Sequence, residues 1–183
     1  SISGLLQIVY VRQKFPKGLG HAILTAKDLV GDEAFAVLLS DDVIDSRVPC
    51  LKQMMAVYER YGTSVVAIQR VPRSAVSSYG IVRARLVRGK KWNGRLYQID
   101  DMVEKPSPRD APSNLAIIGR YLLTPAIFKE LESTRPGAGG EIQLTDALRR
   151  LLKQEPVYGL EFEGRRHDAG SKQGFLQATV EMA

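Results

Sequence analysis

Short apolar runs alternate with longer amphipathic stretches in the first half of the chain, and this order constrains the fold more than any other feature. Three runs have the length of β-strands, at residues 6–11, 34–40 and 64–71. Between them, residues 20–30 and 48–62 carry apolar side chains at helical spacing, and a glycine marks the end of each stretch. The run at 34–40 has the apolar character of a strand buried on both faces. This strand–helix–strand–helix–strand order predicts a parallel sheet covered by helices.

The second half of the chain adds antiparallel structure to this prediction. Residues 79–87 and 95–105 flank the turn sequence KKWNG and predict a β-hairpin. Further strands are expected at 114–123 and 156–164, and helices at 124–134, 141–154 and 171–183. The expected fold class is therefore α/β, with a Rossmann-like, mixed, mainly parallel sheet, flanking helices and a β-rich insertion. We expect residues 1–183 to form a single domain.

Charge and cysteine content narrow the functional classes. The formal net charge of +6 suits anionic ligands such as nucleotides and sugar phosphates. The densest basic cluster, at residues 83–95, contains Trp92 as its only aromatic side chain, so a solvated hairpin is favoured over a nucleic-acid patch. No apolar run approaches the ~20 residues that span a membrane. Cys50 is the single cysteine, which fits a cytoplasmic location, and it is expected to be an inert small residue.

Polar residues follow three of the predicted strands, where α/β sheets bind their ligands. Asp41 and Asp42 come directly after an apolar run, and a carboxylate there could hold Mg²⁺ or cap a helix. Asp168 follows the last strand and could be a second metal ligand. Glu104 and Lys105 would suit a sugar hydroxyl and a phosphate, but only if the strand ends between them. Within a strand they would point to opposite faces, and a surface ion pair before a proline-bounded loop is an alternative that is at least as common.

A glycine-containing segment, RQKFPKGLGHAI at residues 12–23, leads into the first predicted helix. A phosphate or nucleotide at the N-terminus of that helix would explain the glycines, and so would a tight turn. The chain contains no Gly-Lys-Ser/Thr phosphate loop, no Gly-x-Ser-x-Gly elbow and no His-Glu-x-x-His motif. Residue chemistry alone therefore predicts a crevice for an anionic ligand and leaves the reaction open.

Several exact strings occur in an order that is similar to a known family. They are PKGLGHAI, LLSDD, YGIV, MVEKP, SNLAIIGRY, GEIQLTDA and HDAGSKQGFLQA. With them the chain resembles the bacterial UTP–glucose-1-phosphate uridylyltransferases (UDP-glucose pyrophosphorylases), which are sugar nucleotidylyltransferases. The resemblance implies the nucleotide-diphospho-sugar transferase fold and Mg²⁺ as cofactor. It also implies the substrates UTP and glucose 1-phosphate and the products UDP-glucose and pyrophosphate. Catalysis would then rest on positioning and on neutralising phosphate charge.

The resemblance further implies roles for the residues that match its motifs. Asp41 and Asp168 would hold the Mg²⁺ ion. Lys105 and Lys172 would be the catalytic cations, placed at the phosphate groups.

Base and sugar contacts follow from the same motifs. Gln13 and Gly18 would contact the uracil, because a glycine allows close approach of the backbone. Five residues would contact or shape the sugar site: Gly80, Glu104, Asn114, Gly119 and Glu141.

The chain departs from the family pattern at its start. The family has a first strand and a loop of the form Gly-x-Gly-Thr-Arg, which clamps the triphosphate, and no stretch here matches it. We therefore expect an N-terminally truncated, partial nucleotidyltransferase domain with little or no transferase activity alone. A sheet that lacks this strand would expose an edge, so we also expect a homo-oligomer.

Two alternative functions stay open at this point. One is a glucose-1-phosphate thymidylyltransferase, which differs in its base pocket. The other is a non-catalytic module that binds nucleotide sugars. Neither nucleic acid nor membrane is an expected partner.

Overall fold

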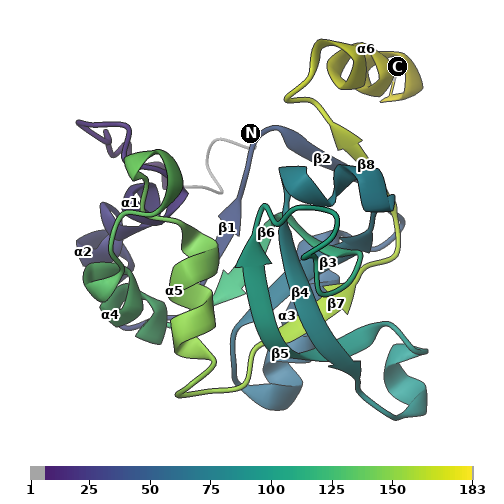
Figure 1. The fold of residues 1–183 in the computed structure, drawn as a ribbon, viewed down its shortest axis with the longest axis horizontal. Helices are drawn as coiled ribbons and strands as arrows, with labels where there is room; N and C mark the ends of the chain where they lie inside the picture. The colour runs from purple at the N-terminus through teal and green to yellow at the C-terminus, as the bar shows by residue number, and fades with distance from the viewer. Residues whose placement is uncertain (1–6, 183) are drawn as a thin grey trace.

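A six-stranded mixed sheet forms the centre of the fold, with helices on both sides (Figure 1). The computed structural model describes residues 7–182. The strand order is β1-β6-β3-β7-β5-β4. The strands are β1 (Phe35–Leu38), β3 (Val65–Arg70), β4 (Gly80–Leu86), β5 (Leu96–Glu104), β6 (Leu115–Leu123) and β7 (Tyr158–Glu161).

A second, two-stranded sheet pairs β2 (Asp42–Asp45) with β8 (Arg165–Asp168), which the apolar pattern did not predict. Both strands are short and rich in charged residues, so they carry no apolar signal. In their antiparallel register Asp42 lies opposite Asp168. This small sheet therefore joins two segments that lie far apart in the sequence.

The mixed α/β fold class is confirmed, but neighbouring strands of the main sheet are mostly antiparallel. β1, β3, β4 and β7 run in one direction, and β5 and β6 run in the other. Among the described strands only β3 and β7 pair in parallel. β6 lies between β1 and β3 and pairs with both, which separates two strands that the helical crossover makes parallel. The prediction of a mainly parallel sheet is therefore right in that most strands run in one direction. It is wrong in that most neighbouring strands pair in an antiparallel arrangement.

Two layers of helices bury the faces of the sheet. Side chains alternate along β3, so Val66 and Ile68 pack on the side of α1, α4 and α5, and Val65 and Ala67 pack on the side of α3. The helices are α1 (Leu19–Leu24), α2 (Lys27–Val30), α3 (Cys50–Tyr61), α4 (Ala126–Ser133), α5 (Leu144–Leu151) and α6 (Lys172–Met182). Short 3₁₀ turns are η2 (Arg73–Ser78), η3 (Lys90–Trp92) and η4 (Ala138–Gly140). No helix within residues 7–182 has both the length and the apolar character that a membrane span requires.

Two predictions made from apolar runs are wrong. Residues 7–11 form no strand, and residue 6 of that prediction lies outside the described residues. Tyr10 is 91% exposed, and no described strand pairs with this segment. A strand needs a neighbour for its backbone hydrogen bonds, which an apolar sequence alone does not supply. The second wrong prediction is that the strand in 34–40 is buried on both faces. β1 is only partly buried, because among the described strands it lies at the edge of the sheet and pairs with β6 alone.

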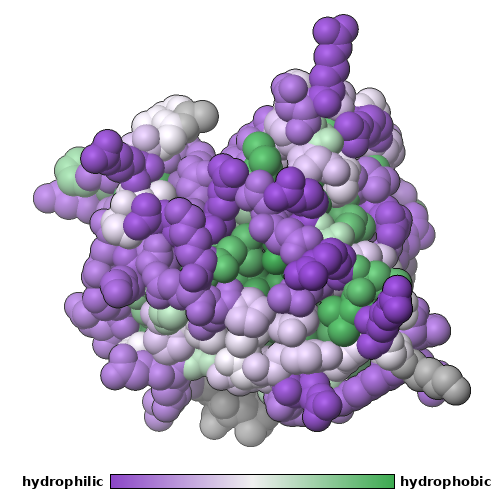
Figure 2. Space-filling model, turned by 60° about the horizontal axis from the view of Figure 1, so that its bottom comes forward, coloured by the Kyte–Doolittle hydropathy of each residue, from purple (hydrophilic) through white to green (hydrophobic). Residues whose placement is uncertain are grey.

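Apolar residues also reach the surface at α6, which stands apart from the body of the molecule (Figure 1). Phe175, Leu176 and Val180 on this helix are all exposed. Hydrophilic side chains dominate the face shown in Figure 2, with apolar patches between them. Contiguous apolar surface is a feature of interaction sites.

Cys50 is buried at the start of α3, where its sulfur lies 3.9 Å from that of Met54. Burial raises the pKa of the Cys50 thiol to about 11, so little reactive thiolate exists at neutral pH. We expect iodoacetamide at pH 8 to alkylate the folded chain on the order of a hundredfold more slowly than the denatured chain. Alkylation followed by mass spectrometry measures both rates on the single cysteine. Equal rates would contradict the assignment of Cys50 as an inert packing residue.

Candidate active site

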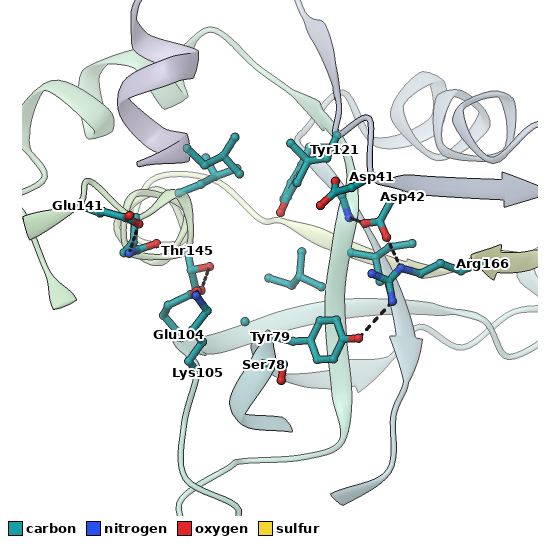
Figure 3. Close-up of a pocket in the computed structure, with 18 residues that line it drawn as sticks. Asp41, Asp42, Ser78, Tyr79, Glu104, Lys105, Tyr121, Glu141, Thr145 and Arg166 are labelled. Atoms are coloured by element: carbon teal, nitrogen blue, oxygen red, sulfur yellow. Dashed lines mark hydrogen bonds and ion pairs between the residues drawn. The ribbon is translucent and has the colours of Figure 1, made fainter. Parts of the chain in front are cut away.

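A cavity of about 280 Å³ lies where the main sheet meets the β2–β8 sheet and the start of α5 (Figure 3). Carboxylates, cations, hydroxyl groups and glycine backbone line it together. Six of the predicted site residues are among its walls: Asp41, Gly80, Glu104, Lys105, Gly119 and Glu141. The fold thus gathers residues that are up to 100 positions apart in the sequence, since Asp41 and Glu141 share the cavity.

Glu104 and Lys105 both face this cavity because the strand ends between them. β5 ends at Glu104, and Lys105 adopts a left-handed backbone with φ of 44°. The Lys105 N–H donates to the Tyr79 carbonyl at 3.0 Å and fixes this turn. The ammonium lies 3.9 Å from a Glu104 carboxylate oxygen. The strand thus ends between Glu104 and Lys105, which is the condition under which both side chains can face one ligand.

Thr145 holds the Glu104 carboxylate in place. Its hydroxyl donates to Glu104 Oε2 at 2.6 Å from the first turn of α5. Gly80 makes room for this pair, since a Cβ there would lie 2.9 Å from Thr145 Oγ1 and 3.2 Å from Glu104 Oε2. The other oxygen of Glu104, Oε1, is the one that lies 3.9 Å from the Lys105 ammonium. Sequence analysis missed Thr145, because a threonine inside an amphipathic helix carries no signal of its own.

The adjacent residues Asp41 and Asp42 have separate environments. Asp42 is buried, forms an ion pair with Arg166 through one oxygen, and accepts the Gly119 N–H at 2.5 Å with the other. Asp41 is exposed at the cavity wall. Burial alone would lower the pKa of Arg166, but Asp42 and Tyr79 raise it overall, so the guanidinium stays charged. Only Asp41 of the doublet is free to meet a ligand.

Asp41 and Asp168 converge beside Gly170. A Cβ on Gly170 would lie 3.1 Å from Asp41 Oδ2 and 3.2 Å from Asp168 Oδ1, so both oxygens border the same small space. The Ala169 N–H donates to the Asp41 carbonyl at 2.7 Å and ties the two loops together. Across residues 7–182, no group of three or more metal-binding side chains forms a metal centre. Two carboxylates suit Mg²⁺, which takes waters and substrate phosphates as its remaining ligands.

The glycine-rich loop before α1 forms a tight turn against the segment that carries Glu141. Gly18 has φ of 87°, and a Cβ there would lie 2.7 Å from the Cβ of Glu141. Backbone hydrogen bonds join Lys17 and Gly20 to Ile142 on either side. The Gln13 side chain donates to the Gly18 carbonyl at 3.1 Å. The glycines are thus required by the turn and by close packing.

Five predicted site residues do not line the cavity: Gln13, Gly18, Asn114, Asp168 and Lys172. The Asn114 side-chain amide donates to the Val71 carbonyl at 3.3 Å, and the Asn114 backbone carbonyl accepts the Val71 N–H at 3.0 Å. Lys172 is the first residue of α6. The cavity lining alone therefore gives none of these five residues a contact with a ligand.

Tyr121 on β6 was missed by sequence analysis and lines the cavity among its carboxylates. Figure 3 shows its hydroxyl directed into the cavity. Burial raises the pKa of this hydroxyl, and the negative charges of Glu104 and the aspartates raise it further. The group is therefore a neutral hydrogen-bond donor at physiological pH.

A fold of this kind with a mixed acidic and basic cavity at the strand ends is typical of enzymes that handle nucleotides and sugars. The chain belongs to the nucleotidyl transferase family, whose family model matches residues 2–183. It is 51% identical over 179 residues to the UTP–glucose-1-phosphate uridylyltransferase of Staphylococcus haemolyticus, covering 98% of this chain and 60% of that protein. The Bacillus subtilis protein of the same name is 48% identical over 181 residues, covering 99% of this chain and 60% of that protein. The chain thus spans about 60% of the length of these curated relatives.

Solved structures agree with this family. A UDP-glucose pyrophosphorylase complexed with UDP-glucose superposes with a TM-score of 0.89 at 48% identity, covering 95% of this chain and 65% of that one. A UTP-bound UGPase from Acinetobacter baumannii gives a TM-score of 0.84 at 36% identity, covering 97% and 60%. A putative glucose-1-phosphate thymidylyltransferase from Bacillus anthracis shares the fold alone, at 22% identity and a TM-score of 0.71. The family resemblance and the fold class predicted from the sequence are confirmed.

Proposed function

We propose that this chain carries the nucleotide-sugar site of a UTP–glucose-1-phosphate uridylyltransferase. The reaction transfers a uridylyl group from UTP to glucose 1-phosphate and releases UDP-glucose and pyrophosphate. The convergence of six motif residues on one cavity carries this proposal. A relative crystallised with UDP-glucose and another with bound UTP support it.

The sugar and its phosphate would lie between Glu104 and Glu141. Their carboxylates would accept hydrogen bonds from sugar hydroxyls. Gly80 and Gly119 line the same cavity and leave room for the side chains that shape it, Thr145 and Glu104 at Gly80 and Asp42 at Gly119. Lys105 neutralises the phosphate from the end of β5. The cavity thereby holds the attacking phosphate oxygen in a fixed orientation, which is the main source of rate in phosphoryl-type transfer.

Asp41 and Asp168 would hold a Mg²⁺ ion at the edge of this cavity. Such an ion neutralises charge on the nucleotide phosphates when it is bound. Lys172, four residues after Asp168, would add a second cation on the phosphate side. Gln13 and Gly18 would contact the uracil, and Asn114 would support the sugar pocket through its hydrogen bonds to Val71.

The experiment that tests the proposal is calorimetric titration of UDP-glucose into the chain with and without Mg²⁺. We expect binding that requires Mg²⁺ and that is lost in Asp41→Ala. dTDP-glucose serves as the competing ligand, and tighter binding of dTDP-glucose would favour a thymidylyltransferase instead. A folded chain that binds neither sugar nucleotide would overturn the proposal.

We also propose a cytoplasmic homo-oligomer. The exposed apolar residues of α6 and the edge strand β1 support association. Light scattering of the purified chain tests this directly, and a monodisperse monomer would count against it.

Glu104→Gln is expected to weaken UDP-glucose binding by on the order of tenfold to a hundredfold, because charged hydrogen bonds to sugar hydroxyls are lost. Binding of UDP, which has no sugar beyond its diphosphate, should change little. Titration of both ligands separates a sugar contact from a general loss of folding. Glu59→Gln on the exposed face of α3 is the matched control. A parallel loss of UDP and UDP-glucose affinity would contradict the role of Glu104 in sugar binding.

A further inference from the structure

One cation, Arg166, contacts two of the three carboxylates at the β2–β8 end of the cavity. The carboxylates belong to Asp41, Asp42 and Asp168, and the Arg166 side chain is only 11% exposed. The neighbouring guanidinium of Arg120 is occupied by backbone carbonyls, including that of Asp42. Of these two arginines, it is therefore Arg166 that pairs with the acidic side chains.

Each nitrogen of the Arg166 guanidinium meets a different partner. Nε pairs with Asp42 Oδ1, and Nη1 donates to the Tyr79 hydroxyl at 3.2 Å. Nη2 lies 3.6 Å from Asp168 Oδ2. The guanidinium also lies over the Tyr79 ring, 5.4 Å from its centroid (Figure 3). A planar fork can hold three partners at fixed angles in a way that a lysine ammonium cannot.

These contacts divide the carboxylates into two groups. Asp42 has both oxygens occupied, one by Arg166 and one by the Gly119 N–H. Asp168 is approached by Arg166 at Oδ2. Its Oδ1, which accepts the Gly170 N–H at 3.2 Å, faces the space beside Gly170 that Asp41 Oδ2 also borders. One oxygen from each of two different carboxylates, Asp41 and Asp168, thus borders the same space and has no side-chain partner among the described contacts.

We propose that Arg166 is a positioning residue that assigns these carboxylates to separate tasks. It removes Asp42 from the set of cation ligands and orients Asp168 so that one oxygen joins Asp41 in holding a divalent cation. Partners of this kind commonly change metal affinity by about 10–100-fold when they are removed. The inference rests on the proposed function for the identity of the metal-dependent ligand.

Charge-balanced variants can separate positioning from simple charge. Arg166→Lys keeps the positive charge beside Asp42 but loses the fork that reaches Asp168 and Tyr79. The double variant Asp42→Asn/Arg166→Gln removes one charge of each sign, and its asparagine can still accept the Gly119 N–H. Arg165→Lys is the control, because Arg165 is exposed and pairs with Glu181 on α6.

The measurement is Mn²⁺ affinity by electron paramagnetic resonance of the free ion, with UDP-glucose present and absent, alongside the thermal midpoint of each variant. We expect Arg166→Lys and the double variant to stay folded near the wild-type midpoint and to bind Mn²⁺ about tenfold more weakly. Arg165→Lys should match the wild type in both respects. A folded variant of either design with wild-type Mn²⁺ affinity would show that Arg166 is only structural and would overturn the inference.

The wild-type chain separates this inference from the proposed function. Mn²⁺ binding without any UDP-glucose binding would refute the proposed function and leave the variants to decide on Arg166. A wild-type chain that binds no Mn²⁺, even with UDP-glucose, would overturn the inference itself.

Discussion

Asp42→Ala is expected to lower the free energy of unfolding by about 3 kcal/mol, because it removes the closer and more buried of the two carboxylates that pair with the Arg166 guanidinium. Asp42 is 5% exposed, and the side chain of its partner Arg166 is 11% exposed. The Gly119 N–H loses its acceptor in the same variant. Urea denaturation followed by the fluorescence of Trp92, the single tryptophan, measures the change.

The adjacent substitution Asp41→Ala supplies the contrast. Asp41 is exposed, and its backbone carbonyl, which accepts the Ala169 N–H, survives the change. Stability should stay within about 0.5 kcal/mol of the wild type, while Mg²⁺-dependent binding of UDP-glucose disappears. Equal destabilisation by the two substitutions would contradict the division of the doublet into a structural and a ligand-binding aspartate.

The sequence correctly predicted the elements that depend on residues close together in the chain. α3 ends as expected at Gly62, which adopts the left-handed conformation that glycine favours, and the β4–β5 hairpin pairs as expected. The segment at 6–11 has equal apolar character but no strand in its described part, because pairing depends on a neighbour far away in the sequence. The place of β6 between β1 and β3 was equally invisible to periodicity.

The residues of the candidate site likewise fall into those that the sequence identified and those that only the fold identified. Motif strings pointed to Asp41, Glu104 and Lys105, and the cavity contains all three. They did not point to Arg166 or Thr145, whose functions depend on contacts across 124 and 41 residues of sequence. A side chain that acts by holding another side chain becomes visible only when the fold brings the two together.

Gly119→Ala is expected to destabilise the chain by about 3 kcal/mol, the upper part of the usual range for overpacking. A Cβ at this position on β6 would lie 2.6 Å from Asp42 Oδ2 and 2.7 Å from the Leu39 Cβ. Neither neighbour can move easily, because Asp42 is held by Arg166 and the Leu39 N–H donates to the Gly119 carbonyl at 2.9 Å. Gly137→Ala is the control, since its φ is −96° and its nearest neighbour would lie 3.4 Å away.

Gly119→Ala also distinguishes two reasons for the glycine. If Gly119 serves only to admit the sugar, the alanine variant should unfold at the same urea concentration as the wild type and bind UDP-glucose more weakly. If packing against Asp42 and Leu39 requires the glycine, stability must fall first, and Mn²⁺ affinity should fall with it because Asp42 and Arg166 are displaced together. The contact distances favour the second outcome. The fold and the acidic end of the cavity then both depend on the absence of a side chain at position 119. Wild-type stability of Gly119→Ala would refute it.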